Sequence, residues 1–294
     1  MKSFKFTCKG KPVVVYPINT GTVAMKTKAH TIRYNNMGMR LFDIVTDKKF
    51  TEDLPVFCWL ILHPEGYFLI DTGYDSHVND PDYFKGAKAI EKWFASTQVR
   101  VNMTKEEELM AQLRALGVSL EQISFVILTH LHVDHVGGIP NMKGAKFLVN
   151  ETELKDNTQA FLLPSWFEPI KVSLQKGVIE CFPASYTVTE AGDMHMVSTP
   201  GHTKGHCSVL LQTDDADILF AGDVVYDVRQ LLDDTIAVPN SRKSSLNSYK
   251  NIRDYASKRP LVVLPSHDQR SLRRLHQPFE YVIPNTSGRR MSAD

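Results

Sequence analysis

Short apolar runs bounded by turn residues recur along the chain, and their lengths are typical of β-strands. The runs cover residues 12–18, 56–62, 67–70, 125–128, 146–149, 194–197, 208–212, 217–220 and 261–264. The short segment 63–66 predicts a hairpin between two of these runs. The unbroken run at 125–128 indicates a strand that is buried on both faces.

Two further segments carry apolar side chains at helical spacing. Thr104–Glu107 has the form of a capping box, and leucines follow it on one face until Gly117. Residues 245–257 fit an amphipathic helix. The apolar stretch 161–167 is interrupted by a proline and predicts a loop instead. Strands and helices share the chain, which predicts an α/β protein.

The two halves of the chain show a similar order of strands and turns. A strand ends in Asp71-Thr-Gly in the first half, and another ends in Ala-Gly-Asp223 in the second. We therefore expect two related halves, each a sheet covered by helices, in one four-layer αββα domain over residues 1–294. Residues 19–55 are polar and long for a connection, so we expect a lid-like excursion there, and residues 279–294 are expected to form a C-terminal tail.

Composition narrows the classes of protein. The chain has 34 Lys and Arg against 33 Asp and Glu, and its formal net charge is +1. This balance argues against a protein that coats nucleic acid or an anionic membrane. Four scattered cysteines predict free thiols, and neither a signal peptide nor a membrane span is apparent. We therefore expect a soluble cytoplasmic protein.

The densest chemical signal lies directly after the run 125–128, where the letters HLHVDH follow. Residues two apart in extended backbone point the same way, so His130 and His132 can face one metal ion. Asp134 and His135 follow where the chain leaves the strand, and they can turn toward a second point nearby. Imidazole and carboxylate ligands suit zinc or a similar ion.

Three other strand exits carry residues of the same kind. His202 follows one strand, Asp223 follows another, and His267 with Asp268 follows the last. Each could be an ordinary turn by itself, but four such clusters at strand ends together indicate ligands for metal. His206, which is close to His202 in sequence, is expected to shape the turn rather than to bind metal.

Together these motifs resemble the metallo-β-lactamase superfamily over about residues 55–268. The resemblance implies a dinuclear site that holds two divalent ions, with zinc as the expected metal. It assigns the first metal to His130, His132 and His202, the second to Asp134, His135 and His267, and both to Asp223. Candidates to support these ligands through hydrogen bonds are Asp71, Thr129 and Asp268.

Two local features resemble the N-acyl homoserine lactone lactonases. Tyr226 lies three residues after Asp223, and residues 53–73 are similar to the opening hairpin of that family. The resemblance implies a quorum-quenching hydrolase that opens the lactone ring with a hydroxide bridging two metals. Tyr226 would then donate a hydrogen bond to the oxyanion, and Asp134 would carry the proton to the leaving alkoxide.

An acyl tail requires an apolar groove. Candidates to line it are Met25, Phe42, Trp166 and Phe167, and each of these could instead be an ordinary core or dimer-contact residue. Residues 242–274 carry nine Lys or Arg, which could attract an anionic substrate or RNA but more often form a solvated helix face. The expected partner is a small lactone or ester, and no nucleic acid or membrane is expected to bind. Formation of a homodimer is left as a possibility.

Two alternative functions remain beside the lactonase. The first is another hydrolase of the same fold: a thioesterase similar to glyoxalase II, a phosphotriesterase-like enzyme or a different lactonase. The second is a ligand-binding protein that keeps the fold without the chemistry, and the intact ligand set argues against it. The sequence does not determine the preferred acyl length, the native metal or the oligomeric state.

Overall fold

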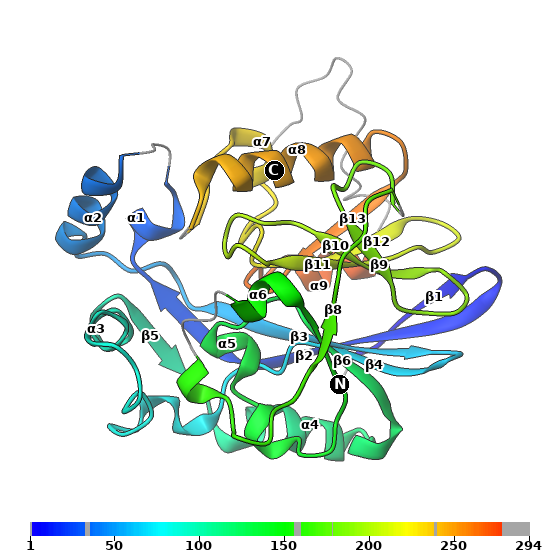
Figure 1. Ribbon diagram of the computed structural model, residues 1–294, viewed down its shortest axis with the longest axis horizontal. Helices are drawn as coiled ribbons and strands as arrows, with labels where there is room; N and C mark the ends of the chain where they lie inside the picture. Colours follow the sequence, from blue (N-terminus) through cyan, green and yellow to red (C-terminus); the bar gives the residue numbers. More distant parts are fainter. Residues whose placement is uncertain (1, 33–35, 156–159, 178, 238–239, 278–294) are drawn as a thin grey trace.

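Two β-sheets pack face to face, and helices cover the outer face of each sheet (Figure 1). The computed structural model describes residues 2–32, 36–155, 160–177, 179–237 and 240–277. In the view of Figure 1, helix α4 (Leu109–Ala115) lies below the first sheet, and helix α8 (Arg242–Ala256) lies above the second. The predicted αββα layering is confirmed.

The first sheet contains eight strands. Their bounds are β1 Phe4–Cys8, β2 Lys11–Met25, β3 Leu54–His63, β4 Gly66–Ile70, β5 Val99–Asn102, β6 Ile123–Leu128, β7 Phe147–Asn150 and β8 Ile170–Val172. Strands β1 to β4 pair antiparallel in chain order, and β5 pairs with the last part of β2. The order then continues β4-β6-β7-β8 with parallel pairing, so β4 and β6 end at the same edge of the sheet.

The second sheet has the order β13-β12-β11-β10-β9. Its strands are β9 Ser185–Thr187, β10 Met194–Ser198, β11 Cys207–Leu211, β12 Asp217–Gly222 and β13 Leu261–Pro265. Strands β9 to β12 pair antiparallel, whereas β12 and β13 are parallel. Strands β10, β12 and β13 therefore run in the same direction and end at one edge.

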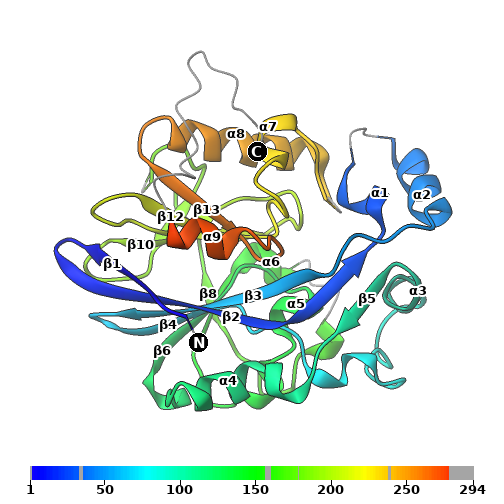
Figure 2. The same ribbon diagram turned by 180° about the vertical axis from the view of Figure 1, so that it is seen from behind.

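The remaining helices are short. They are α1 Thr27–His30, α2 Met37–Thr46, α3 Ala89–Thr97, α5 Val133–Val136, α6 Glu151–Lys155, α7 Gln230–Asp233 and α9 Ser271–His276. Both views show α1, α2, α3 and β5 together at one side of the sandwich (Figure 2). Within the described ranges, every helix is too short or too polar to cross a membrane.

Strand β3 shows why an unbroken apolar run becomes a central strand. Its side chains alternate: Phe57 and Trp59 face the second sheet, whereas Cys58 and Leu60 face the helices beneath the first. The Trp59 ring packs against Phe220 of β12, with ring centroids 5.4 Å apart. Both faces of β3 are therefore buried, and the hydrophobic core between the sheets runs along one of them.

The outer layers follow from helical spacing. Leu109 and Leu113 of α4 pack on the first sheet, and Tyr249 and Ile252 of α8 pack on the second. The predicted capping box is present, but its first turn is a 3₁₀ turn over Lys105–Glu107. Helix α4 itself begins at Leu109, two residues after that turn.

The structure differs from the expectation of a lid over residues 19–55. Strand β2 continues to Met25, because its last part pairs with both β3 and β5. Helices α1 and α2 occupy much of the segment that follows. These strand partners are distant in sequence, so the local polarity of the segment could not reveal them. The predicted tail at 279–294 lies outside the described residues.

Strand β1 is absent from the predicted elements although its sequence alternates. Phe4 and Cys8 are buried against the core, whereas Lys5 and Thr7 are exposed. This alternation with period two is the signature of an edge strand with one buried face. Lys5 and Thr7 form the solvent face of β1.

The segments that follow the strands bring the candidate ligands to one edge of the sandwich. Asp71 follows β4, and His130 lies just beyond β6. Strands β10, β12 and β13 of the other sheet lead into His202, Asp223 and His267 respectively. The strand directions described above place all of these exits at the same end, where the two sheets face each other.

Candidate metal centre

The first group of candidate ligands consists of three imidazoles, His130, His132 and His202. The Nε2 atom of His130 lies 3.0 Å from Nδ1 of His132, and Nε2 of His202 lies 2.8 Å from that same nitrogen. His130 and His202 are buried, and His132 is half-buried. Three converging imidazole nitrogens are a donor set that suits one zinc ion.

The second group contains two carboxylates and two imidazoles: Asp134, His135, Asp223 and His267. The Nε2 atom of His267 lies 3.2 Å from Oδ2 of Asp134 and 3.3 Å from Oδ1 of Asp223. The Nε2 atom of His135 lies 3.2 Å from the same Oδ1 of Asp223. This mixed oxygen and nitrogen set could hold a second divalent ion.

Asp223 lies between the two groups. Its Oδ1 atom faces His135 and His267, as described above. Its Oδ2 atom faces the first group, 3.4 Å from Nε2 of His202 and 3.9 Å from Nε2 of His130. One carboxylate thus presents an oxygen to each set of imidazoles, which is the geometry that a bridging ligand requires.

Two glycines allow the ligand loop to approach the turn after β4. A Cβ atom on Gly137 would lie 2.6 Å from the backbone nitrogen of Asp75, and one on Gly138 would lie 2.6 Å from the carbonyl oxygen of Thr72. The backbone N–H of Thr72 donates to the carbonyl of His135 at 2.9 Å. Larger residues would push α5, and His135 with it, away from this turn.

Asp71, predicted to support a metal ligand, contacts the candidate ligand His135. Its Oδ2 atom lies 2.7 Å from Nδ1 of His135, and its Oδ1 atom accepts the backbone N–H of Thr129 at 2.8 Å. The Thr129 hydroxyl also donates to Asp71 at 2.9 Å. On the other imidazole, Nδ1 of His267 lies 2.9 Å from the carbonyl oxygen of Pro55. In the neutral form of each ring, a proton on Nδ1 would leave the Nε2 lone pair for metal.

Two other buried side chains hold a candidate ligand or the loops that carry candidate ligands. His206 accepts the backbone N–H of Asp223 on its Nε2 atom at 3.0 Å, so it positions a candidate ligand without joining either group. Glu153 of α6 accepts the backbone N–H groups of Leu131 at 3.1 Å and Gly205 at 3.0 Å. Glu153 was not among the sequence candidates, and no local motif marks it.

Asp268 does not contact a candidate ligand among the described residues. Its carboxylate lies 2.8 Å from Nη1 of Arg274 and accepts the backbone N–H of Arg270 at 2.8 Å. This ion pair belongs to the turn that begins α9, so the structure gives Asp268 a different role from the predicted one. Its position next to His267 in sequence is what made it a candidate.

Four buried atoms of the second group have no hydrogen-bond partner among the described residues. They are Nε2 of His135, Nε2 of His267 and both carboxylate oxygens of Asp223. Buried polar atoms without partners are costly and rare in folded proteins. Divalent cations would satisfy all of these atoms, so the residues present fit two metal ions.

The two groups differ in how they hold protons. Burial and neighbouring imidazoles lower the pKa of His130 and of His202 well below the usual value. Burial acts in the same direction on His135 and His267, but Asp223 and the neighbouring carboxylates outweigh it. They raise the pKa of His135 well above its usual value and that of His267 to about 10. The first group therefore offers neutral nitrogens, and the second attracts cations.

Tyr226 lies against both groups. Its ring centroid is 4.7 Å from that of His267 and 5.9 Å from that of His202. Burial, together with the charge of Asp223, raises the pKa of the Tyr226 phenol well above its usual value. The hydroxyl therefore keeps its proton at neutral pH and can act as a hydrogen-bond donor.

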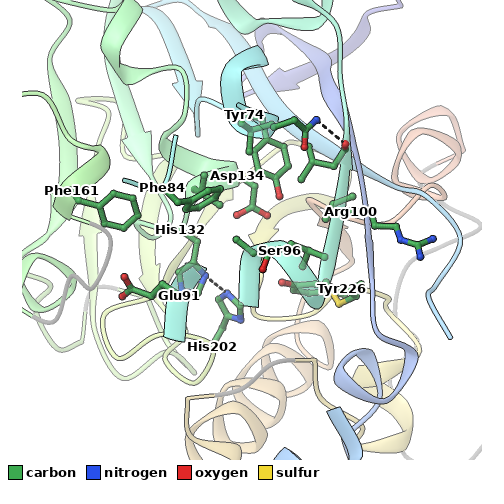
Figure 3. Close-up of a pocket in the computed structure, with 18 residues that line it drawn as sticks. Tyr74, Phe84, Glu91, Ser96, Arg100, His132, Asp134, Phe161, His202 and Tyr226 are labelled. Carbon is green, nitrogen blue, oxygen red and sulfur yellow. Dashed lines mark hydrogen bonds between the residues drawn. The ribbon is translucent and has the colours of Figure 1, made fainter. Parts of the chain in front are cut away.

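A cavity of about 700 Å³ opens onto the metal centre (Figure 3). His132, Asp134, His202 and Tyr226 line its inner end. Most of the remaining wall is apolar and includes Val23, Met25, Val78, Phe84, Val101 and Phe161. Strand β5 and helix α3, neither of which was predicted, supply one side of this wall. The arrangement can bind a molecule with one reactive polar end and one apolar end.

The predicted pocket residues have mixed outcomes. Met25 lines the cavity, as expected. Phe42 does not, because it lies on the outer face of α2 with 67% of its surface exposed. Trp166 and Phe167 also lie elsewhere: both pack against the core beneath the first sheet, and the Phe167 ring is 5.1 Å from that of Phe147. Apolar character alone did not distinguish cavity walls from core contacts.

The basic segment 242–274 is largely paired within the protein. Lys250 pairs with Asp254, Arg253 with Asp234, Lys258 with Glu180, Arg259 with Asp217, and Arg274 with Asp268. These pairs favour the expectation of a solvated helix face over a binding surface for RNA.

Comparison with known proteins gives the family. Residues 51–267, more than half of the chain, match the model of the metallo-beta-lactamase superfamily. The chain therefore belongs to this superfamily. The predicted family is confirmed, and the matched range contains every candidate ligand in the two groups.

Relatives and solved structures with lactonase names cover most of the chain. An N-acyl homoserine lactonase from a Bacillus species is 28% identical over 220 residues, which cover 74% of this chain and 82% of the relative. The N-acyl homoserine lactonase AttM of Rhizobium radiobacter is 27% identical over 271 residues, 86% of this chain and 92% of that protein.

Among solved structures, an N-acyl homoserine lactone hydrolase with the product N-hexanoyl-L-homoserine at its catalytic metal centre aligns with a TM-score of 0.68. The identity is 20%, and the alignment covers 93% of this chain and 96% of that one. AidC, a dizinc quorum-quenching lactonase, aligns with a TM-score of 0.60 at 16% identity, covering 90% of each chain. At these identities, the likeness shows the shared fold.

Proposed function

We propose that this protein hydrolyses the lactone ring of N-acyl homoserine lactones and thereby quenches quorum signals in the cytoplasm. The observation that carries the proposal is Tyr226, which lies beside His202 and His267 at the inner end of an apolar cavity. The lactonase relatives that cover most of the chain support it. The four free cysteines fit a reducing compartment.

We propose further that each ligand group holds one divalent ion, with Asp223 contacting both, and that the metal is zinc. The support is the donor chemistry of the two groups and their unpartnered buried atoms. When bound, two such ions supply a hydroxide nucleophile at neutral pH and polarise the lactone carbonyl. The protein then has to orient the ring and manage the protons.

Tyr226 and Asp134 are the side chains that we assign to these tasks. The protonated Tyr226 hydroxyl donates a hydrogen bond to the carbonyl oxygen as negative charge develops there. Asp134 lines the same cavity end, and Nε2 of His267 lies 3.2 Å from its carboxylate. Asp134 can take the proton from the nucleophile and deliver it to the ring oxygen, which otherwise leaves as an alkoxide.

The remaining wall accounts for the rest of the substrate. An acyl chain that extends from the ring passes along Val78, Phe84 and Phe161, where it is removed from water. A cavity of about 700 Å³ falls within the size range of small-molecule sites. Chains of medium length can be accommodated without rearrangement of the walls.

A substrate panel tests this function against the other hydrolases of the fold. Metal-replete protein is offered acyl homoserine lactones from butanoyl to dodecanoyl, a glutathione thioester and a phosphotriester, and hydrolysis is followed by proton release. We expect the lactones to give the highest kcat/KM. Efficient hydrolysis of the thioester or the phosphotriester with no lactone opening would replace the lactonase by that enzyme class.

The same assay tests the role of Tyr226. Tyr226→Phe should lower kcat by about a hundredfold without changing metal content, because one oxyanion donor is lost. Tyr186→Phe is the matched control, since Tyr186 is 39% exposed on β9 and is not part of the cavity wall. Unchanged lactone turnover in Tyr226→Phe would remove the oxyanion role.

A further inference from the structure

Tyr74 is a second tyrosine at the inner end of the cavity. It follows the Asp71-Thr-Gly73 turn, it is only 3% exposed, and it lines the cavity. Figure 3 shows its hydroxyl pointing toward the carboxylate of Asp134. Among the described residues, none forms a hydrogen bond with the Tyr74 hydroxyl. Its O–H group therefore faces the cavity without an acceptor.

The two phenols occupy different sides of the metal centre. Tyr226 lies against His202 and His267, whereas Tyr74 lies on the side of Asp134. Burial and the nearby Asp134 carboxylate raise the pKa of Tyr74 well above its usual value, as burial does for Tyr226. Both hydroxyls therefore keep their protons at neutral pH, and they lie on different sides of the centre.

The other polar groups of the cavity wall are already engaged or lie toward solvent. The exposed Asn79 donates to the carbonyl of Val101 at 3.1 Å, and the exposed Ser96 donates to the carbonyl of Trp93 at 3.1 Å. Glu91 accepts the backbone N–H of Lys88 at 2.8 Å. The guanidinium of Arg100, which is exposed, lies over the ring of Phe50, 3.9 Å from its centroid. Tyr74 is thus a buried donor that the described protein leaves without a partner, apart from the centre itself.

An N-acyl homoserine lactone carries a group that needs such a donor. Its amide joins the ring to the acyl tail, so a ring held at the metal centre places the amide at the start of the apolar wall. An amide carbonyl that is removed from water without a hydrogen bond loses affinity. The Tyr74 hydroxyl and the amide carbonyl oxygen of such a substrate would therefore lie at the same part of the cavity.

We propose that the Tyr74 hydroxyl donates a hydrogen bond to the carbonyl oxygen of the substrate's N-acyl amide. Tyr74 is then a positioning and specificity-determining residue that selects lactones with an acylamino substituent over plain lactones. This inference rests on the proposed lactonase function and deepens it. Tyr226 donates a hydrogen bond to the ring carbonyl, and Tyr74 recognises the acylamino substituent.

Two substrates separate these roles. N-Hexanoyl homoserine lactone has the amide, and α-hexyl-γ-butyrolactone has the same ring with a hydrocarbon tail on the same carbon and no amide. In Tyr74→Phe, the ratio of kcat/KM for the first substrate to that for the second should fall about tenfold, mainly through a higher KM. In Tyr226→Phe both substrates should lose kcat together. Tyr83→Phe is the matched control, because Tyr83 packs beside Phe84 outside the cavity wall.

Binding of ring-opened products gives a second readout that is independent of turnover. Calorimetry with N-hexanoyl-L-homoserine should show a weaker Kd, by about tenfold, in Tyr74→Phe than in the wild type. With 2-hexyl-4-hydroxybutanoate, which has the same carboxylate and primary hydroxyl and carries its tail on the same carbon but has no amide, the two proteins should bind alike. A selective loss with the amide compound supports the hydrogen bond.

The outcomes separate this inference from the proposed function. If the wild type opens both lactones and Tyr74→Phe leaves the ratio unchanged, the Tyr74 proposal fails and the lactonase stands. Equal losses on both substrates would also overturn it, since Tyr74 would then act on the shared chemistry or on folding. If the wild type opens neither lactone, the lactonase function fails and this inference fails with it.

Discussion

The two ligand groups of the centre have opposite electrostatic character although they share one carboxylate. In the first group, burial keeps the imidazoles neutral by lowering the pKa of His130 and His202. In the second group, carboxylates overcome burial and raise the pKa of His135 and His267. The second group contains two carboxylates and the first group none, so the two groups should bind two identical cations with unequal affinities once the imidazoles of the second group release their protons.

Each group also has its own buried carboxylate behind it. The Asp71 carboxylate accepts a hydrogen bond from Nδ1 of His135 and so supports the second group directly through a candidate ligand. Glu153 receives the backbone N–H groups of Leu131 and Gly205, so it supports the first group through the loops that carry its histidines. Asp71 therefore contacts a ring of the second group, whereas Glu153 contacts only the backbone of the loops that carry the first group. Asp71 also accepts the backbone N–H of Thr129, whose hydroxyl lies 3.1 Å from Nδ1 of His130, so a weaker link runs from Asp71 to the first group.

Removal of the shared carboxylate, Asp223, should have the largest effect on metal binding and activity, because each ligand group then loses an oxygen. Asp223→Ala is expected to lose most of the metal from both groups and to lower kcat/KM by about a thousandfold or more, equivalent to several kcal/mol. Metal analysis and the lactone assay measure this. Asp254→Ala on the exposed face of α8 is the control. A variant that keeps two metals would contradict a bridging role.

Removal of one histidine from each group should expose their unequal affinities. His202→Ala and His267→Ala should each retain about one metal per chain, and each should lower kcat/KM by about a hundredfold. The ion left in His202→Ala keeps both carboxylates, so chelator competition should show it held at least about tenfold tighter than the ion left in His267→Ala. Equal affinities would mean that the difference in charge between the two ligand groups does not affect metal binding.

The convergence of the ligand groups could be predicted because the strands determine it. His130 and His132 are two apart after a buried strand, and Asp223 and His267 end strands that turned out to be parallel neighbours. Each ligand is close in sequence to a strong strand signal. Periodicity and motif spacing therefore carried enough information to place these side chains at one edge.

The supports and walls of the site could not be predicted in the same way. The contacts of Glu153 reach 22 residues back to Leu131 and 52 residues forward to Gly205. Strand β5 has only four residues with alternate side chains half-buried, so its pattern is too short to stand out. Phe42 shows the opposite failure, because an apolar side chain that suited a groove lies on the surface of α2.

The two supporting carboxylates provide a finer test of the comparison. Asp71→Asn should weaken metal binding to the second group, and Glu153→Gln should weaken binding to the first, by about ten- to a hundredfold each. Both substitutions keep the side-chain shape, and chelator titration of the partly loaded protein measures the affinities. If both variants lost metal from the same group, the separate supports inferred for the two groups would be wrong.

The smallest effect concerns the pH dependence of the metal-free protein. His130 and His202 have lowered pKa values in the folded state, so the unfolded chain takes up protons first as the pH falls below about 6.5. Stability should therefore decrease on the acid side. His267 has a pKa raised to about 10, so its contribution is complete below about 6.5 and is lost as the pH rises through about 10. Each proton changes the slope by about 1.4 kcal/mol per pH unit.

The variants of the two groups should change opposite arms of this profile. His202→Ala removes a histidine that must stay neutral, so the free energy of unfolding should fall less steeply between about pH 6.5 and 5 than in the wild type. His267→Ala removes a histidine that holds its proton, so the decline between about pH 7 and 10 should become shallower. Urea unfolding of the metal-free proteins at several pH values measures both slopes. If either substitution flattened the other arm, the assignment of neutral and cation-attracting groups would be reversed.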